Sequence, residues 1–366
     1  MGSVGDAGDL GGGAGGGDEV FVRAGATAAS GAGAGGRRIF SHPQDAYCVA
    51  YHVGTLAAFG CAFWVYQHPQ AAGIAGPWSR AAYVIGAAYV LGWIAAVDVG
   101  VNFHNHAHRP IFTSGFWNRW FGRLWTFSGG WPSFFWEYSH LTVHHAQLLS
   151  EVDWTLPKKR ADGSFEDFRV YALAHWPWRY FVHLYGDLIA GRGMRRRALR
   201  ELGIFLALWS VPFWFDWRMA LCLWVLPQWM ANTTVMGPGM YAQHAGCRRK
   251  SAERPVSHST VFLSKFMNLT MFNIGYHLEH HDHPRVHWTE LAELHEKLKP
   301  ELIAGGAHVV EYGMFHAAYL LAGDEERQKR FAESAAGYEK GGVMAEGRGR
   351  GEAVKGEARE ATALGD

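Results

Sequence analysis

The stretch AAYVIGAAYVLGWIAAVDVGVNFHNHAH, at residues 81–108, decides the fold class. Residues 81–101 are almost continuously apolar, which is the length and composition of a helix that crosses a membrane. His104, His106 and His108 follow directly after this run. A span that carries clustered imidazoles at its end predicts a polar site at the membrane surface.

Three further apolar runs occupy residues 46–66, 202–215 and 219–236. The first is long enough to span a membrane, while the last two are shorter and are separated by the polar turn Asp216-Trp217-Arg218. We therefore predict an all-α fold with four transmembrane helices in two hairpins. The alternative, a soluble protein with buried core helices, is disfavoured because runs this apolar are hard to bury in one soluble domain.

Basic residues predict how the protein lies in its membrane. Lys and Arg gather before the first run, between the second and third runs, and at residues 248–250 after the fourth, whereas the hairpin connections hold few. Because cytoplasmic loops carry an excess of Lys and Arg, both termini and the long central loop are expected on the cytoplasmic side. The prediction is an integral, multi-pass membrane protein with a cytoplasmic helical cap.

The composition of the 366 residues sets further limits. Residues 1–40 are Gly/Ala-rich and residues 323–366 are charged, so both are predicted to be disordered tails around a membrane domain at 41–322. A net charge of +1 gives no sign of nucleic-acid binding, and four Cys without a CxxC pair exclude a disulfide scaffold. The unusual count is 21 His.

All three dense histidine clusters lie on the predicted cytoplasmic side. On a helix, residues i and i+4 share a face, so His104 should point with His108, and His140 with His144. His106 should point away from both partners in its cluster. The three clusters supply eight candidate metal ligands: His104, His108, His140, His144, His145, His277, His280 and His281.

The number and type of these ligands indicate the metal chemistry. Eight imidazoles are too many for one tetrahedral zinc, and they suit two ions of higher coordination number. An all-nitrogen site at a membrane, without thiolates, points to non-haem iron and oxygen chemistry. A His-rich membrane metal-binding or transport protein is the alternative from another class, although transport would favour ionisable residues inside the spans.

The third cluster carries a family resemblance. It reads NIGYHLEHHDHP at residues 273–284, followed by Trp288 and Leu291. This is similar to the NxGYHxEHHxxPxxxWxxL signature of sphingolipid desaturases and carotenoid ketolases. Together with the other two clusters and the order of the spans, residues 45–300 resemble the integral-membrane fatty acid desaturase superfamily.

The resemblance implies a site and an activity. Members hold two Fe ions at a cytoplasmic centre, use O2 as co-substrate, and have one further ligand before the last cluster, where this chain has His244. The implied function is a membrane-bound O2-dependent di-iron desaturase that introduces a double bond into a lipid acyl chain. No catalytic residue is predicted beyond the metal centre.

Two departures keep the reaction open. The second cluster reads HxxxHH, which is one residue longer than in most desaturases and is similar to the spacing in the alkane hydroxylase branch. In the first cluster, Asn105 stands where many relatives have an acidic residue. A di-iron hydroxylase or ketolase acting on a lipid, carotenoid or alkane is therefore the alternative. His42-Pro43-Gln44-Asp45 lacks the glycines of a fused haem motif. A separate electron donor of the cytochrome b5, ferredoxin or rubredoxin type is expected.

Carboxylates near the clusters are candidates to orient the ligands, because a ligating His usually donates its other ring N–H. Asp98 is the foremost candidate, since a carboxylate at the end of a span needs a partner. The full set is Asp98, Glu137, Asp153, Glu279 and Asp282. The aromatic segment 117–136 is predicted to lie at the membrane interface or to form a wall of an acyl channel.

Overall fold

A computed structural model describes residues 38–335 apart from 159, 162, 163, 191 and 192. Within this part the protein is mostly helical, as predicted, with one pair of short strands. Residues 1–37 and 336–366, which hold most of the two predicted tails, lie outside the described residues.

Three stretches of helix in the described part are long and apolar enough to cross a membrane: Asp45–Gln67, Pro77–His108 and Arg195–Phe215. The second is built from α3 (Pro77–Val97), the wider π-helical turn η1 (Asp98–Phe103) and α4 (His104–His108). The first is α2 (Asp45–Gln67), and the third joins α9 (Arg195–Trp209) to α10 (Val211–Phe215).

The fourth predicted span forms a continuous helical course with a more polar sequence. Gln228 and Asn232 are buried within it and hydrogen-bond to Trp209 and Trp131. Its role as a span stays a prediction. The course consists of α11 (Trp217–Ala220), η5 (Leu221–Val225), α12 (Leu226–Met230), η6 (Ala231–Met236) and α13 (Gly237–His244).

Local chemistry explains how the long helices turn and pack. The Asp216 carboxylate accepts hydrogen bonds from the backbone N–H groups of Arg218 and Met219, so it caps α11 at the predicted polar turn. At Gly92 a Cβ atom would lie 2.8 Å from the Pro227 carbonyl oxygen. The absence of a side chain at Gly92 therefore lets α3 and α12 pack closely.

The length of the second stretch predicts that the first histidine cluster lies outside the membrane. Its 32 residues measure about 48 Å at the rise of an α-helix, whereas the hydrocarbon core is about 30 Å thick. We therefore expect the end of the stretch, with His104 and His108, to project beyond the apolar layer.

Short helices between the second and third stretches form one part of the cap. They are α5 (Gly115–Phe127), α6 (Ser133–Glu137), η2 (Tyr138–His145), α7 (Phe168–Val170), η3 (Tyr171–His175), α8 (Trp176–Leu184) and η4 (Tyr185–Ala190). In α5, Trp117 and Trp120 are exposed, while Trp125 is fully buried. The position of this segment at the membrane interface stays a prediction.

The rest of the cap follows α13. Its helices are α14 (Lys265–Thr270), α15 (His277–Asp282), the 3₁₀ turn η7 (Trp288–Glu290), α16 (Leu291–Ala304), α17 (Met314–Leu321) and α18 (Glu325–Ala335). Strand β1 (Thr260–Phe262) pairs in parallel with β2 (His308–Val310), and Val261 lies opposite Val309. These strands depart from the all-α prediction.

The predicted boundary at residue 323 also differs from the structure. Residues 325–335 form α18, and its Phe331 is buried in the core of the cap. This single aromatic side chain gives the helix an apolar surface to bury, so the ordered region extends beyond the predicted domain.

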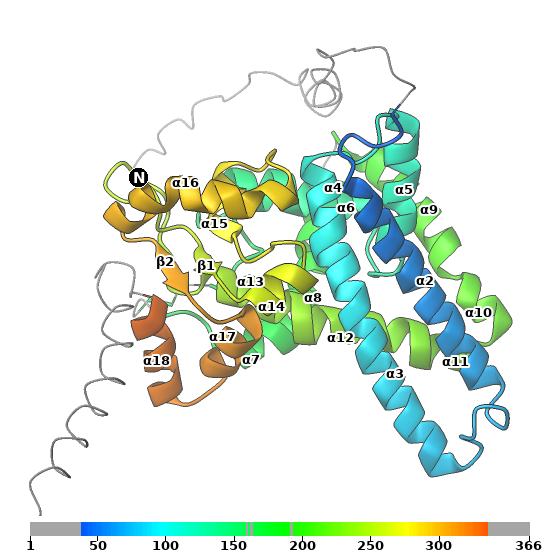
Figure 1. Cartoon of the computed structure of the whole chain (residues 1–366). Coiled ribbons are helices and arrows are strands. Elements are labelled where there is room, and N and C mark those ends of the chain that lie inside the picture. The colour runs from blue at the N-terminus through cyan, green and yellow to red at the C-terminus, as the bar shows by residue number, and fades with distance from the viewer. Residues whose placement is uncertain (1–37, 159, 162–163, 191–192, 336–366) are drawn as a thin grey trace, which may run out of the picture.

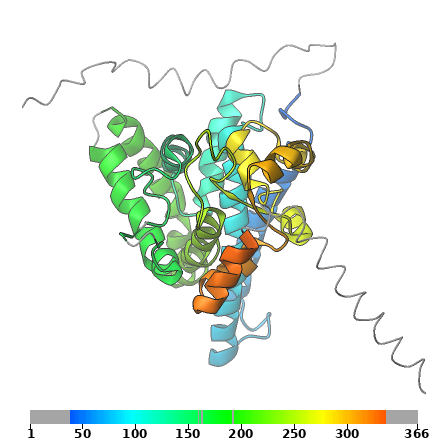
Figure 2. The same cartoon turned by 90° about the vertical axis from the view of Figure 1, so that its left-hand side faces the viewer.

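Figure 1 shows the long helices and the C-terminal helices on different sides of the protein. Helices α2, α3, α10 and α11 lie on the right, and α14–α18 with the two strands lie on the left. In Figure 2, the C-terminal helices α17 and α18 face the viewer. They lie on the side of the molecule opposite α10 and α11.

Candidate metal centre

The structure brings all nine predicted histidines together in two neighbouring groups. Within each group, the ring nitrogens that could bind an ion lie within 4.8 Å of one another. Neither group contains a carboxylate or a thiol. The five-histidine group is His104, His108, His140, His145 and His280, and the four-histidine group is His144, His244, His277 and His281.

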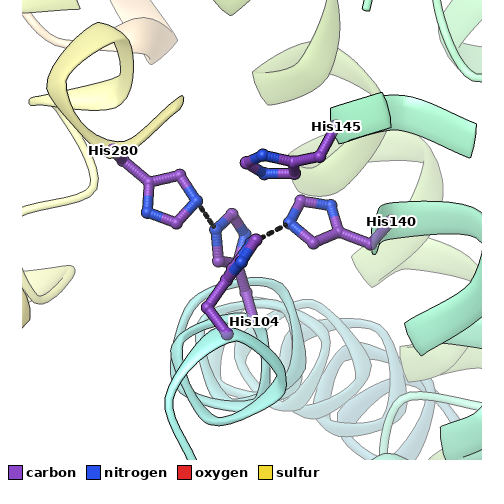
Figure 3. Close-up of side chains that lie close together, drawn as sticks. His104, His140, His145 and His280 are labelled. Carbon is purple, nitrogen blue, oxygen red and sulfur yellow. Dashed lines mark hydrogen bonds between the residues drawn. The ribbon is translucent and has the colours of Figure 1, made fainter. Parts of the chain in front are cut away.

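The five-histidine group is assembled from α4, η2 and α15 (Figure 3). The Nε2 atoms of His104 and His280 lie 2.6 Å apart, and those of His108 and His140 lie 2.9 Å apart. The His145 Nε2 atom is buried and has no hydrogen-bond partner among the residues that the structure describes. The rings therefore direct their Nε2 atoms toward a common centre.

The four-histidine group joins η2, α13 and α15. His277 Nε2 lies 3.3 Å from His244 Nε2 and 3.1 Å from His281 Nε2. His144 Nε2 is buried, and no group in the described part of the chain hydrogen-bonds to it. His144 and His145 are neighbours in the chain, yet their rings belong to different groups.

The second cluster corrects the expectation that His140 and His144 share a face. Residues 138–145 form a π-helical turn, so the side chain that aligns with His140 is His145, five residues on. The wider turn accommodates the extra residue of the HxxxHH spacing. In the regular helix α4, His104 and His108 stay together as predicted.

The residues present fit a pair of metal ions. Burial lowers the pKa of His280 to about 3 and also lowers the pKa of His140, His145, His277 and His281, each of which has other imidazoles nearby. These rings are therefore neutral at physiological pH, as metal ligands must be. Two buried Nε2 atoms without partners, on His144 and His145, supply the lone pairs that an ion would take up.

Hydrogen bonds at Nδ1 orient two rings of the four-histidine group. His244 Nδ1 lies 3.0 Å from the His258 carbonyl oxygen, so this nitrogen carries the proton and Nε2 keeps its lone pair. His144 Nδ1 lies 3.3 Å from Asp153 Oδ2 and 3.3 Å from Thr155 Oγ1. Asp153 was among the candidate carboxylates, whereas Thr155 and the His258 carbonyl have no recognisable signal in the sequence.

The foremost candidate carboxylate does not contact a ligand. Asp98 is fully buried and binds His52 Nδ1 at 2.8 Å and Trp125 Nε1 at 2.6 Å. It stabilises the packing of α2 and α5 against the second stretch. Glu279 is also fully buried and binds His295.

The last two candidate carboxylates likewise contact residues outside both groups. Asp282 binds Lys250 at 2.5 Å, and Glu137 lies 3.9 Å from Arg197. Of the five candidate carboxylates, Asp153 is the one that hydrogen-bonds to a predicted metal ligand, His144.

An apolar cavity opens beside the two groups. His104, His140 and His277 form part of its wall. Methionines from η6, α13 and α17 line much of the rest, together with Trp136 from the aromatic segment. The sequence did not reveal this cavity, because its wall is assembled from elements far apart in the chain.

Comparison with known proteins supports the sequence resemblance. The family model for fatty acid desaturases matches residues 78–313, a range that contains all nine histidines. A sphingolipid delta(4)-desaturase-like protein of Oryza sativa subsp. japonica is 24% identical over 224 residues, which cover 60% of this chain and 65% of that protein. The match thus spans slightly less than two thirds of the relative.

Proposed function

The chain belongs to the fatty acid desaturase family, and on this premise we propose that it is an O2-dependent di-iron desaturase of a lipid acyl chain. Family membership and the apolar helices identify an integral membrane protein of the desaturase type of oxidoreductase. The observation that carries the finer proposal is the position of two all-histidine groups beside an apolar cavity.

The chain's own residues have three tasks in this proposal. The nine imidazoles bind two iron ions through neutral nitrogens, and Asp153 and the His258 carbonyl hold two of the rings in place. The cavity holds the acyl chain against His104, His140 and His277 and excludes water from it. Bound iron would supply the oxidising power that removes hydrogen from an unactivated methylene.

The overall reaction needs an external reductant. Formation of one double bond with O2 consumes two electrons and two protons and yields two molecules of water. We propose that a separate cytochrome b5-, ferredoxin- or rubredoxin-type protein delivers these electrons.

Lipid analysis of cells that express the chain tests the reaction. We expect O2-dependent loss of two hydrogens from a lipid, and no such product with His280→Ala at equal protein level. Added oxygen without a new double bond would instead establish the hydroxylase or ketolase alternative. Unchanged lipids with altered cellular metal content would favour a metal-binding or transport protein.

Elemental analysis tests the cofactor. Protein purified from iron-replete cells should contain about two irons per chain and little zinc, because nine clustered imidazoles, five of them in one group, exceed the four ligands of one tetrahedral zinc. One stoichiometric zinc without iron would contradict the di-iron proposal.

We also propose that both termini and the metal centre face the cytoplasm, on the strength of the Lys and Arg distribution. Tags at both ends should be accessible from the cytoplasmic side, and a tag in the loop near Gly73–Pro77 should be accessible from the opposite side. A terminal tag that is reachable only from outside would overturn this orientation.

A further inference from the structure

The short helix α14 presents its largest apolar side chains outward. Phe266 is 76% exposed and Leu269 is 84% exposed, and because they are three residues apart they share one face of the helix. On the opposite face, Met267 is buried in the core, as is Met271, which directly follows the helix. A helix that is apolar on both faces needs an apolar surface on each side.

The polar groups of α14 are satisfied within the protein. Asn268 is buried, and its carboxamide donates to the Phe262 carbonyl at 2.9 Å and accepts the Gly275 N–H at 2.9 Å. The exposed Thr270 hydroxyl donates to the Phe266 carbonyl at 2.8 Å. The polar amide thus faces the interior and the apolar side chains face outward, which is the reverse of a helix whose outer face meets water.

Contacts with the long helices fix the level of this segment. Phe272, two residues beyond the end of α14, packs edge-on against Tyr51 of α2, with ring centroids 5.7 Å apart. The Tyr51 hydroxyl donates to the Ile94 carbonyl of α3 at 3.5 Å. Ile94 lies within the apolar run 81–101 and precedes His104 by ten residues, which is about 15 Å along a helix. The end of α14 therefore lies beside the apolar part of two candidate spans.

Helix α17 lies at the same level and packs against α14. The Phe315 ring of α17 lies 4.3 Å from the Trp93 ring of α3, measured between centroids. The Met314 backbone N–H lies 3.3 Å from Met267 Sδ of α14. Two helices that follow the last predicted span thus adjoin α3 within its apolar run.

We propose that α14 lies in the membrane leaflet nearest the metal centre, with Phe266 and Leu269 inserted among the lipid acyl chains. The occupant of this face is the bilayer, because the apolar layer that surrounds α2 and α3 extends to the helix packed beside them. Lys265 is exposed at the start of α14, and its long side chain can reach the lipid phosphates.

This position places the bilayer next to the cavity. Met271 and Met314 line the cavity, and Met267 packs against Met314. A single layer of side chains from α14 and α17 therefore separates the inserted face from the cavity, and an acyl chain enters past α14. The entry route rests on the proposed function, whereas the membrane contact does not.

Fluorescence quenching of the full-length protein in phosphatidylcholine nanodiscs tests the membrane contact. A nitrobenzoxadiazole label is attached at Leu269→Cys after the exposed Cys61 and the half-buried Cys222 are replaced by Ser. Val90→Cys on α3 is the reference for a lipid-facing site, since Val90 is exposed within the apolar run. Ile303→Cys on α16 is the reference for a site in water, because α16 lies far from the lower end of α3 (Figures 1 and 2).

We expect a nitroxide near the top of the lipid acyl chain to quench the label at Leu269→Cys as strongly as at Val90→Cys. Aqueous iodide should quench the label at Ile303→Cys and leave the other two bright. Quenching of Leu269→Cys by iodide would overturn the proposal. Weak quenching by both agents would also overturn it, because a second copy of the chain would then cover α14. Phe266→Cys supplies a second site on the same face if Leu269→Cys unfolds at a lower temperature than its parent.

A charged substitution tests the entry route in cells that express the chain. Leu269→Glu should lower the amount of desaturated lipid by about 10-fold or more at equal protein level, because the apolar burial of one leucine is lost and the charge withdraws α14 from the acyl chains. Ile303→Glu is the matched control and should leave the product unchanged. Both variants should keep their metal content.

The outcomes separate this inference from the proposed function. Full product formation by Leu269→Glu would overturn entry past α14. If the unaltered protein forms no desaturated lipid, the desaturase proposal fails, while the quenching experiment still decides whether α14 is inserted.

Discussion

The two histidine groups are held in place by different means. In the four-histidine group, side-chain and carbonyl oxygens from outside the helices fix His144 and His244 at Nδ1. In the five-histidine group, the described residues provide no hydrogen bond to Nδ1, and the His140 Nδ1 atom is buried without a partner. Helix packing therefore positions the five-histidine group, whereas a hydrogen-bond network also helps to position the four-histidine group.

The largest expected effect comes from removing one ligand of each group. His280→Ala and His144→Ala should each lower activity by more than about 100-fold, which exceeds the effect usual for residues that merely orient a ligand. If each group binds one ion, each variant should retain about one iron per chain. Elemental analysis at matched protein level checks this, and two irons retained in either variant would contradict the division into two groups.

Acidification of the metal-free protein should destabilise both groups together. The folded pKa of His280 is about 3 against 6.5 for the free side chain, so between these values the unfolded chain binds protons that the folded chain does not. Stability should be constant above about pH 6.5 and should fall as the pH is lowered toward 3. Unfolding curves at pH 7.5, 6 and 5 test the sign, and greater stability at pH 5 would contradict it.

Regular helix geometry explains which parts of the centre the sequence could predict. The i,i+4 rule places His104 with His108 and His277 with His281, as the structure has them. The rule fails for His140, because the backbone forms a π-helical turn that the residue types do not announce. His244 could be found only through the family resemblance, since it stands alone in its helix.

The parts that the sequence did not predict depend on contacts between distant segments. The cavity combines residues from α3, η6, α13 and α17, and no local pattern encodes such a wall. The β1–β2 pair joins residues 260–262 to 308–310 in two segments of three residues each, too short for a periodic signal. Asp98 was correctly expected to have a partner, but the identity of that partner, His52, depends on how α2 packs.

A paired substitution tests whether the outer hydrogen bonds matter to the four-histidine group. Asp153 and Glu279 are both buried carboxylates bonded to a histidine, but His144 is a predicted ligand and His295 is not. Asp153→Asn should weaken metal binding at this group by about 10- to 100-fold and leave the other group loaded. Glu279→Gln should leave both ions bound, as metal titration of the two variants would show.

If Glu279→Gln loses metal as readily as Asp153→Asn, general destabilisation of the cap explains both effects. In that case the network around His144 has no special role. Thermal unfolding of the two variants provides the control, because both lose a charged partner in a buried position.

The smallest effect is expected at His106, which lies between two predicted ligands and belongs to neither group. Its two ring nitrogens are already occupied by the protein. Nε2 donates to the Asn118 carbonyl at 3.2 Å, and Nδ1 accepts the Ile111 backbone N–H at 3.4 Å. The ring therefore has no lone pair to offer an ion.

His106→Ala should consequently retain two irons and most of the activity. The change removes a buried ring from beside Trp125 and leaves two backbone groups without their partner, so the free energy of unfolding should fall by about 1–3 kcal/mol. Activity and iron content must be compared with His280→Ala at equal protein level, because a destabilised membrane protein accumulates less. If His106→Ala is as inactive and as poor in iron as His280→Ala, then the first cluster contributes three ligands, and the assignment of the five-histidine group is wrong.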